Sequence, residues 1–595
     1  MKKKKEFFIV NNKKEKINII WDEYFANEDD VSILQYIENN SAILKDKYVT
    51  LVERIGFLKI KKKKLIDIFS IKKNFSYWWI TDIYEKSLYK HSSINEVIKL
   101  LAFECILKKR KVQKIVIQNF DPKLIQSIKA ISEKMNITLE FKYKRYFYFN
   151  NILFFKIVFS FLNFLRFIYK RISLNKTNVQ NKNIHKLFCS YFAYVDFEKL
   201  NKNIYHSDFW NGLTNKNNSI IKNSHFLHIF IPNKNISYNK SLKLFKEINK
   251  NSNNQHFFIE EFFSFKIFIK IMNFWISSII KFRLNKKNIK CAFIKKISSW
   301  SFFEDEFVES FCGTSALVNM YYFFLFEELY KKMRSTKKTF FLYENQGWEK
   351  SFIFNLKKIK QNKIFGIQHS TVRFWDLRYT LNKSKDSVLN KFQPHYYCVN
   401  GKDSMKKFAT AGYPLSKLKK VEAVRYSNIL NRIYSKSSKN IFFSSILIVG
   451  DFSVESNLNI SAAINGLCPK SYSNFKFTLK EHPLRKMSHL LNIRFSKSVE
   501  TIENLRKEHV CAIVSNTTSA AVDLYLLGFK LVVIIDKKNV NLSPLKGRQD
   551  VIFLYDQSLL SNYLNKLLKN DIVTTNNANF FYHSSNLNLW NKLIN

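Results

Sequence analysis

Two short polar motifs in the last third of the chain each follow an apolar run that predicts a β-strand. Lys480-Glu481-His482-Pro483 follows the predicted strand Phe475–Leu479. Ser515-Asn516-Thr517-Thr518-Ser519 follows the predicted strand Val510–Val514 and leads into a predicted helix. Ligands bind outside the carboxyl ends of strands in open sheets, and hydroxyls with free backbone N–H groups at a helix start favour a phosphate. We predict that His482 and this hydroxyl-rich segment hold one phosphate.

Each motif also has an ordinary structural interpretation when it stands alone. A Ser/Thr run is a common helix N-cap, and a lone His-Pro is just as readily structural. Because the two motifs come in succession, each directly after a strand, we favour the phosphate site over two unrelated features.

A second group of candidates lies earlier in the chain. Glu344 follows the predicted strand Thr339–Tyr343, and His369 comes shortly after the predicted strand Lys363–Ile367. A carboxylate or an imidazole at a strand end suits a general base. The alternatives are a helix-start carboxylate for Glu344 and a structural histidine for His369.

Four other polar residues carry weaker signals. Asp451 follows Gly450 and is interpreted as a turn aspartate, with a nucleotide contact as the alternative. Arg373, Arg378 and Arg425 have guanidinium groups that match a carboxylate or a phosphate, and we single out none of them.

The elements that position these residues follow from the apolar runs and from the few helix and strand breakers. The chain has only 11 Gly and 7 Pro, most of them after residue 340, where short apolar runs alternate with helical segments. This alternation predicts parallel sheets with helices on both faces. Near the N-terminus, strands Lys114–Ile117 and Ile137–Phe141 flank a helix, Pro122–Lys134. The predicted units are an α/β domain at 1–145, a Phe-rich amphipathic helix and linker at 146–184, a second α/β domain at 185–420 with an amphipathic insert at 257–283, and a nucleotide-type domain at 421–595.

Two segments rich in Phe and Ile, 151–171 and 257–283, lack the uninterrupted apolar length of a membrane span. On a helix, the polar residues of each segment form one narrow stripe. The stripes are Lys156, Ser160, Asn163, Arg166 and Lys170, and Lys266, Lys270, Asn273, Ser277 and Lys281. We predict helices that lie in a membrane interface with their basic residues near anionic headgroups. The alternatives are core or inter-domain helices that expose one polar edge, and, with least support, a true span.

Composition bounds the class of protein. The 595 residues are 46% hydrophobic and 16% aromatic, which suits two or three globular domains and excludes collagen-like and disordered chains. The net charge of +51 is dispersed along the chain, so we expect no nucleic-acid partner. Seven Cys without a C-x-x-C pair indicate a reducing cytoplasm, and the N-terminus lacks the apolar region of a signal peptide, so we expect no secretion.

Family motifs narrow the chemistry further. The sequence contains no G-x-x-x-x-G-K-[ST], G-x-G-x-x-G, H-E-x-x-H or G-x-S-x-G pattern, so NTPase, hydride-transfer, zinc-protease and hydrolase functions lack support. It does contain Lys-x-His-Pro at 480–483, then Ser-x-Thr-x-Ser at 515–519, Asp523 and Leu526-Leu527-Gly528. This succession resembles the nucleotide-binding half of GT-B glycosyltransferases, especially the CMP-sugar-dependent sialyl- and Kdo-type enzymes of capsule and lipopolysaccharide synthesis.

Shorter segments extend this resemblance over most of the chain after residue 75. They are Asn541–Leu545, Gly366–His369, Glu344–Glu349, Cys189–Phe192 and Phe209–Leu213. Together they resemble a family of surface-carbohydrate (O-antigen or capsule) biosynthesis proteins.

The resemblance implies an α/β fold of GT-B type, in which two Rossmann-like domains face a cleft beside the additional N-terminal unit. Residues 185–420 would bind the acceptor, and residues 421–595 the nucleotide sugar. The implied activity is inverting, metal-independent glycosyl transfer without a cofactor. A CMP-linked acidic sugar would be the donor, and the acceptor a lipid-linked surface glycan (O-antigen, lipopolysaccharide or capsule). The implied location is the inner face of the cytoplasmic membrane.

The resemblance also assigns roles to residues. His482 would steady the leaving phosphate in place of a metal, with Lys480 and Pro483 beside it. Thr517, Thr518 and Ser519 would bind the same phosphate together with Ser515, and Asp523 would reach the ribose. Glu344 would be the general base, and His369 a second base candidate or a sugar ligand. In the related sialyltransferases the base is an acidic residue before a Gly, whereas here Glu344 precedes Asn345-Gln346-Gly347, and Glu349 is an alternative ligand for a substrate hydroxyl.

Other functions fit parts of the pattern. Polyol-phosphate transferases share the His-Pro and Ser/Thr elements, and sugar-nucleotide epimerases share the two-domain architecture. A non-catalytic scaffold of a polysaccharide assembly complex is a third alternative, and a basic nucleic-acid-binding protein is the least supported.

Overall fold

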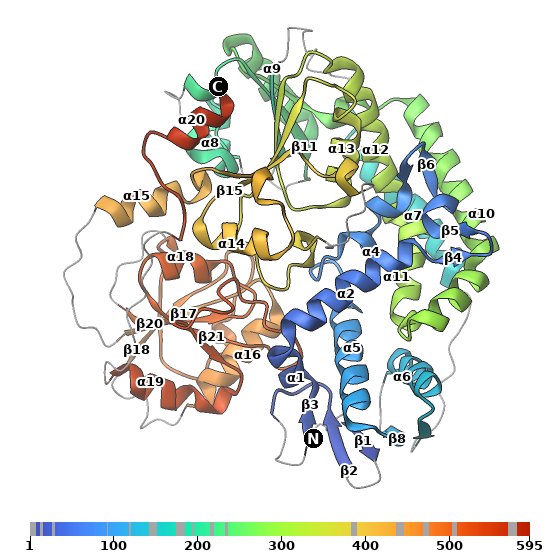
Figure 1. Cartoon of the computed structure of the whole chain (residues 1–595). Helices are drawn as coiled ribbons and strands as arrows, with labels where there is room; N and C mark the ends of the chain where they lie inside the picture. Colours follow the sequence, from blue (N-terminus) through green and yellow to red (C-terminus); the bar gives the residue numbers. More distant parts are fainter. Residues whose placement is uncertain are drawn as a thin grey trace.

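In the part of the chain that it describes, the computed structural model (Figure 1) shows three β-sheets of five to seven strands, two two-stranded ribbons and a layer of long helices. It describes residues 7–11, 16–25, 30–91, 93–117, 121–141, 152–173, 185–192, 195–214, 219–232, 236–381, 389–435, 445–467, 475–502, 509–568 and 580–595. Cys468 lies outside these residues, and the other six cysteines are free thiols.

The N-terminal unit is a five-stranded sheet with the order β3-β2-β1-β8-β9. The predicted strands at 114–117 and 137–141 and the helix between them are present as β8, β9 and α6. Asp121 caps α6 by accepting the Lys123 N–H at 2.6 Å, and Pro122 occupies the first turn, where a missing N–H costs nothing. The bounds are β1 Phe7–Asn11, β2 Lys16–Ile20, β3 Val31–Ser32, β8 Lys114–Ile117, β9 Thr138–Phe141, α1 Ile33–Asn39, α2 Ser41–Gly56, α5 Ser93–Arg110 and α6 Pro122–Met135.

The second sheet has seven strands, all parallel, in the order β12-β11-β10-β13-β14-β15-β16. Its central strands are apolar and buried on both faces, as parallel strands covered by helices must be. The strands are β10 Lys186–Phe192, β11 Ser224–Phe230, β12 Gln255–Phe258, β13 Lys338–Leu342, β14 Lys363–Ile367, β15 Tyr396–Val399 and β16 Leu418–Lys420, with helices α9 Tyr238–Asn251, α13 Gly347–Leu356 and α14 Lys402–Thr410 among those that connect them.

The third sheet has six parallel strands in the order β19-β18-β17-β20-β21-β22. Two Rossmann-like parallel sheets therefore follow the N-terminal unit, which confirms the predicted α/β class. The elements are β17 Ser445–Val449, α16 Val454–Asn465, β18 Lys476–Lys480, β19 Ser496–Lys497, β20 His509–Ser515, α18 Ala520–Leu526, β21 Lys530–Ile534, β22 Ile552–Leu554 and α19 Leu560–Leu568.

The end of the chain returns to the second sheet. Helix α20 (Asn588–Ile594) is held there by Glu422, whose carboxylate accepts the N–H groups of Leu589 at 2.8 Å and Trp590 at 3.0 Å. The Trp590 indole is buried and meets Trp210 edge to face. Residues 588–594, which the sequence assigns to the nucleotide-type domain, thus pack on the other sheet, while the domain boundaries themselves stay a prediction.

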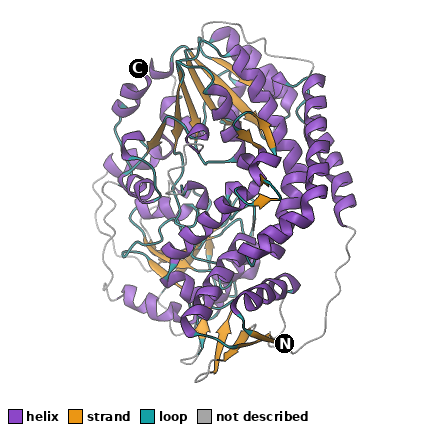
Figure 2. Cartoon of the chain, turned by 45° about the vertical axis from the view of Figure 1, so that its right-hand side comes forward, coloured by secondary structure: helices purple, strands orange, loops and turns teal. Residues whose placement is uncertain are grey.

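A helical layer covers one side of the molecule (Figure 2). Its members are α7 Ile152–Tyr169, α10 Phe265–Lys296, α11 Trp300–Cys312 and α12 Thr314–Lys332. Helices α7 and α10 both pack on α11 and α12, and the rings of Phe161 on α7 and Trp275 on α10 stack with centroids 6.3 Å apart. No helix in the described part of the chain combines the length and the apolarity needed to cross a bilayer.

The two Phe-rich segments differ in part from the prediction. The start of 257–283 is not helical, because Phe257 and Phe258 pair with β11 as part of β12, and the helix begins only after Ser264, which caps it. On α7 the polar residues do not share one exposed face. Ser160 is buried, and Lys156 turns inward to pair with Glu309 at 3.1 Å. Asn163, Arg166 and Lys170 are exposed, but large apolar side chains such as Phe154 and Phe159 also take outward positions.

Candidate active site

Glu344 stands in a tight turn after β13. The Glu349 carboxylate, in the first turn of α13, accepts the backbone N–H groups of Glu344 at 3.0 Å and of Asn345 at 2.8 Å. Asn345 adopts a positive φ of 58°, which Asn tolerates better than most residues. Burial, and then the charge of Glu344, raise the pKa of Glu349 to about 8. Glu349 therefore shapes the turn that presents Glu344, and its carboxylate is already committed to the backbone.

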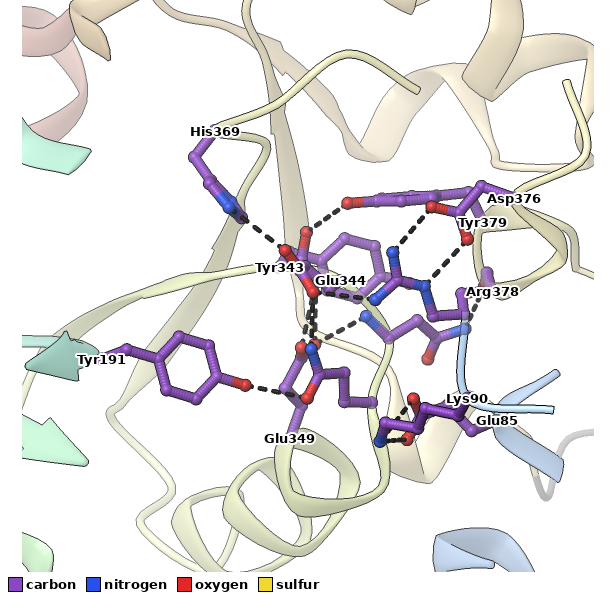
Figure 3. A network of polar contacts seen from close by, with 12 residues as sticks. Glu85, Lys90, Tyr191, Tyr343, Glu344, Glu349, His369, Asp376, Arg378 and Tyr379 are labelled. Carbon is purple, nitrogen blue, oxygen red and sulfur yellow. Dashed lines mark hydrogen bonds and ion pairs between the residues drawn. The ribbon is translucent and has the colours of Figure 1, made fainter. Parts of the chain in front are cut away.

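The Glu344 carboxylate lies at the centre of a buried polar network (Figure 3). His369 Nε2 lies 3.2 Å from one carboxylate oxygen, and the other accepts from Arg378 Nη1 at 2.8 Å and Gln346 Nε2 at 2.5 Å. Arg378 is held in turn by both oxygens of Asp376, at 2.8 and 2.7 Å. Burial alone would raise the pKa of Glu344, but the hydrogen bond and charge of His369, followed by Arg378, lower it well below its usual range. An ionised carboxylate held in this way is a poor proton acceptor.

His369, unlike Glu344, keeps one polar atom without a hydrogen-bond partner within the described ranges. Its side chain is buried against the ring of Phe209, which it meets edge to face with centroids 5.0 Å apart. The ionised Glu344 can only accept, so the proton on His369 Nε2 points at it. His369 Nδ1 has no hydrogen-bond partner among the described residues. A carboxylate thus orients an imidazole whose other nitrogen is buried and unpaired in the part of the chain that the structure describes, an arrangement similar to the Asp-His part of a catalytic triad.

On the third sheet, Asp451 gathers the hydroxyl-rich segment. It follows β17, and its Oδ2 accepts the hydroxyls of Ser515, in a short contact, and of Thr517, at 2.7 Å. Ser515 Oγ accepts the N–H groups of Thr517 at 3.3 Å and Thr518 at 3.1 Å. These hydroxyl and N–H groups, expected to be free for a phosphate, therefore bond to one another and to Asp451. The only signal for Asp451 in the sequence is its place after an apolar run and a glycine, which fits a turn aspartate equally well.

The segment 515–519 forms a loop before α18 rather than its first turn. Helix α18 begins at Ala520, and Thr518 Oγ1 accepts the Ala520 N–H at 3.2 Å. Ser519 is exposed, while Asp523 is half-buried in the first turn of α18. Burial raises the pKa of Tyr426 to about 12, although the charge of Arg425 opposes the rise. The charge of Asp523 adds to it, so Asp523 lies near that tyrosine.

The backbone of His482 lies against Gly450, the residue before Asp451. His482 opens a tight turn in which its carbonyl accepts the Arg485 N–H at 3.0 Å, and the exposed Pro483 takes the second position, which suits its fixed φ. A Cβ added to Gly450 would come within 3.1 Å of the His482 nitrogen, so the two segments touch. The half-buried His482 ring meets Phe452 with centroids 5.8 Å apart, and its Nδ1 accepts the Leu484 N–H at 3.2 Å. Lys480 donates its ammonium to the carbonyl of Glu500.

The structure brings His482 and Thr517 to the same edge of the third sheet. They follow β18 and β20, the two neighbours of β17, so roughly 10 Å of sheet separates their strands. This spacing is compatible with one nucleotide between them.

The loop after β14 joins the two sheets. Arg373 Nη1 donates to the carbonyl oxygens of Thr517 at 2.8 Å and Leu542 at 3.1 Å. The segment that carries His369 therefore touches the segment that carries Thr517. Strand ends of both parallel sheets meet at this point, as the GT-B-like prediction requires.

The three arginines named from the sequence behave differently. Arg373 is bound to carbonyls and Arg378 to carboxylates. Arg425 is half-buried, and its guanidinium lies over the rings of Phe209, at 5.8 Å, and Tyr426, at 5.9 Å. Within the described ranges no hydrogen bond or ion pair engages the Arg425 guanidinium. It is thus a cation available for an anionic ligand, and it shares Phe209 with His369.

Two further features lie apart from this cluster or add nothing to it. A cavity of about 1050 Å³ between α2, α5 and α6 contains none of the residues discussed above. In the part of the chain that the structure describes, no group of three or more His, Cys, Asp or Glu side chains is arranged to hold a metal ion. Metal independence of the reaction stays a prediction.

Neither protein-family models nor curated proteins show a match to this chain. Among solved structures, the Anabaena protein HepE in complex with UDP and glucose covers 65% of this chain and 90% of its own, at 9% identity and a TM-score of 0.32. The UDP-GlcNAc 2-epimerase of Neisseria meningitidis, bound to UDP-GlcNAc, covers 69% and 98%, at 9% identity and a TM-score of 0.36. The wall teichoic acid polymerase TagF covers 71% and 90%, at 10% identity and a TM-score of 0.28. Scores below 0.5 decide nothing about activity.

Proposed function

We propose that this protein is an inverting glycosyltransferase with a nucleotide-sugar donor. One observation carries the proposal: His369 is oriented through Nε2 by the ionised Glu344, while its buried Nδ1 has no protein partner among the described residues. Glu344 and His369 follow the adjacent strands β13 and β14 of one parallel sheet, and the loop that carries His369 contacts the other sheet's loops through Arg373. Such a pair serves a reaction that removes a proton from a hydroxyl.

The transfer would proceed in one displacement. The oxygen of the acceptor hydroxyl forms a bond to the anomeric carbon while its proton passes to His369 Nδ1. The bond from that carbon to the phosphate oxygen breaks, and its electron pair leaves with the nucleotide, so the configuration inverts. Glu344 stabilises the imidazolium that forms. This assigns the base to His369 and makes Glu344 the residue that positions it, in place of the Glu344 base implied by the family resemblance.

Charge on the leaving phosphate would be met by His482 and Arg425. His482 has its Nδ1 occupied by the Leu484 N–H, so Nε2 carries the proton and donates to the phosphate. The Arg425 guanidinium pairs with a second anionic group of the donor, which is the sugar carboxylate in a CMP-linked acidic sugar. Thr518 and Ser519 line the same edge, and Asp451 holds their loop in place. These donors act as electrostatic stabilisation and replace a metal in the proposed mechanism.

The acceptor in this proposal is a lipid-linked glycan of the cell surface, such as O-antigen, lipopolysaccharide or capsule. The enzyme would meet it at the inner face of the cytoplasmic membrane. Large apolar side chains exposed on α7 and α10 support a membrane location.

A donor screen tests the function. Purified protein is heated with CMP, CDP, UDP, GDP and their sugar forms, because a ligand that binds only the folded state raises the melting temperature. We expect the largest shift with a CMP-linked acidic sugar, followed by CMP release when acceptor is added. Release of a polyol phosphate from CDP would indicate a polyol-phosphate transferase, isomerisation of a UDP-sugar an epimerase, and no shift with any nucleotide a scaffold.

A further inference from the structure

The helical layer exposes far more apolar surface than its own fold requires. On α7 the outward residues are Phe154, Phe155, Val158, Phe159, Leu162, Leu165 and Tyr169, and on α10 they are Phe265, Ile269, Ile276, Ile280, Leu284 and Ile294. Phe154 is 70% exposed and Phe265 76% exposed. We call this set the apolar face. Scattered single exposed side chains need no explanation, but two adjoining helices that both expose large side chains indicate a binding surface.

The apolar face belongs to one side of the molecule. Helices α7 and α10 contact each other through Phe161 and Trp275, and both lie over α11 and α12. Figure 1 places the two helices along the same edge of the molecule, away from the third sheet. Their inner positions are filled: Phe164 and Ile271, for example, are fully buried. The outer positions are therefore not needed for the core of the protein.

The charges on the two helices of the apolar face have a single sign. Neither 152–173 nor 265–296 contains an Asp or a Glu. Arg166 and Lys170 near the end of α7, and Lys266, Arg283, Lys287 and Lys290 on α10, are exposed, and no ion pair holds them within the described residues. The inward-turned lysines, in contrast, do find acidic partners, as Lys156 does with Glu309 and Lys286 with Glu304.

A lysine-rich hairpin adds to this charge. Strands β4 (Lys59–Ile60) and β5 (Lys63–Lys64) form a two-stranded ribbon, and β4 contacts α10. Its lysines, Lys59, Lys61, Lys62, Lys63 and Lys64, are all exposed. Adjacent cations on the hairpin and on α10 leave the rim of the apolar face strongly basic.

We propose that the apolar face docks on the surface of an anionic lipid bilayer. The apolar side chains of α7 and α10 enter the boundary between headgroups and acyl chains, and the lysines of the hairpin and of α10 contact the negative headgroups. A second copy of the chain fits less well, because a two-fold contact through this face would bring the two basic rims together. The inference deepens the proposed function by naming its membrane-contact surface, but it uses none of the residues assigned to glycosyl transfer.

Vesicle sedimentation of the full chain tests the proposal. We expect the protein to sediment with vesicles of phosphatidylglycerol and phosphatidylethanolamine, and much less with phosphatidylcholine alone. The apolar variant is F154Q/F159Q/L162Q/F265Q. It should lower partitioning roughly a hundredfold or more, because each large side chain that leaves water contributes more than a factor of ten. The matched control I43Q/L415Q/V499Q removes exposed apolar side chains elsewhere and should bind like the original chain.

Charge variants provide the second arm. K61Q/K62Q/K63Q/K64Q should weaken binding to anionic vesicles by about fivefold per lysine, with the difference vanishing in high salt. K202Q/K222Q/K240Q/K243Q removes the same number of exposed lysines from the second sheet's side and should change little. Thermal unfolding without vesicles checks that every variant folds.

Three results would overturn the proposal. They are no sedimentation with anionic vesicles, unchanged sedimentation of the apolar variant, or light scattering that shows a dimer for the original chain and a monomer for the apolar variant. The last would assign the face to a second copy of the chain. His369→Gln should sediment like the original chain and lose only transfer activity, so failure of the docking surface and failure of the proposed chemistry give different results.

Discussion

At the scale of single residues, the candidate site depends on which partner each polar atom has. Glu344 and His369 both follow strands and both suit a general base, and the sequence cannot rank them. Their contacts can: Glu344 is saturated by His369, Arg378 and Gln346, whereas His369 Nδ1 has no hydrogen-bond partner among the described residues. Asp451 and Ser515 are 64 positions apart, so their pairing is invisible in local spacing.

His369→Gln should lower kcat by about 100- to 10,000-fold, the usual contribution of a general base, with little effect on KM. Glu344→Gln should lower kcat less, because the imidazole remains but loses its orientation and charge stabilisation. Steady-state kinetics on both variants checks this. Equal or greater loss in Glu344→Gln, with full activity in His369→Gln, would return the base to Glu344. His225→Gln, at a buried histidine of β11, is the control for histidine loss alone.

Arg425→Met should raise the Kd for the donor nucleotide sugar about tenfold or more, since a hydrogen-bonded charge pair contributes about 1.5–3 kcal/mol. The melting temperature without ligand should change little, because the guanidinium holds no ion pair among the described residues. Isothermal titration with the donor measures the Kd. Arg494→Met, at an exposed arginine of the third sheet's edge, is the matched control and should bind normally. An unaltered Kd in Arg425→Met would remove Arg425 from the site.

At the scale of elements, apolar runs bounded by turns predicted several central strands of the two parallel sheets well, but not β10, β11 or the short edge strands. The predicted strands Thr339–Tyr343 and Lys363–Ile367 match β13 and β14 to within a residue, because a strand buried in a parallel sheet is apolar along most of its length. The same criterion failed at 257–258, where the apolar run joins a strand to a helix without a break in hydrophobicity. On α7 the predicted polar stripe was wrong, because a helix that is apolar nearly all round does not show in its sequence which side packs inward.

The close approach of two strand ends makes Gly450 sensitive. Gly450→Ala would place a Cβ 3.1 Å from the His482 nitrogen and 3.2 Å from the Met487 sulfur. The turn that carries His482 must then shift, at a cost of about 1–3 kcal/mol in the free energy of unfolding, and nucleotide affinity should fall as well. Denaturant unfolding and nucleotide titration measure the two effects. Gly212→Ala, whose added Cβ meets no atom nearer than 3.5 Å, should be far milder. Comparable effects of both substitutions would argue against a tight Gly450–His482 contact.

Helix α11 contains a carboxyl group that makes stability depend on pH. Burial, and then the charge of Asp82, raise the pKa of Glu306 to about 8, above its ordinary value of 4.5. The folded state therefore holds a proton that the unfolded state releases, so this contribution to stability is complete below about pH 4.5 and declines as the pH rises toward 8. Glu306→Gln keeps the shape without the ionisation. It should be more stable than the original chain by roughly 1–3 kcal/mol at pH 8, but not at pH 4. Unfolding curves at the two pH values check the sign, and an equal difference at both would contradict it.

At the scale of the whole molecule, contacts between sheets join the two halves of the site. Arg373 ties the loop after β14 to Thr517 and Leu542, and the chain end crosses back to the second sheet through α20. Neither feature has a local sequence signature, because both depend on residues more than 140 positions apart. The relative position of His369 and His482 therefore depends on packing that only the folded chain shows.

The return of the chain end should couple the unfolding of the second and third sheets. Trp590 is buried against Trp210, and Glu422 accepts its backbone N–H and that of Leu589. Trp590→Ala leaves a large cavity there and should cost about 3–5 kcal/mol, enough to detach α20 from the second sheet. Because the third sheet then loses a packed link to its neighbour, calorimetry should show two separate transitions in place of one, and kcat should fall with the loosened alignment of His369 and His482. Tyr169→Ala, at an aromatic residue 83% exposed on α7, should leave the calorimetric profile intact. A single transition with unchanged activity in Trp590→Ala would mean that the Arg373 loop alone keeps the two halves aligned.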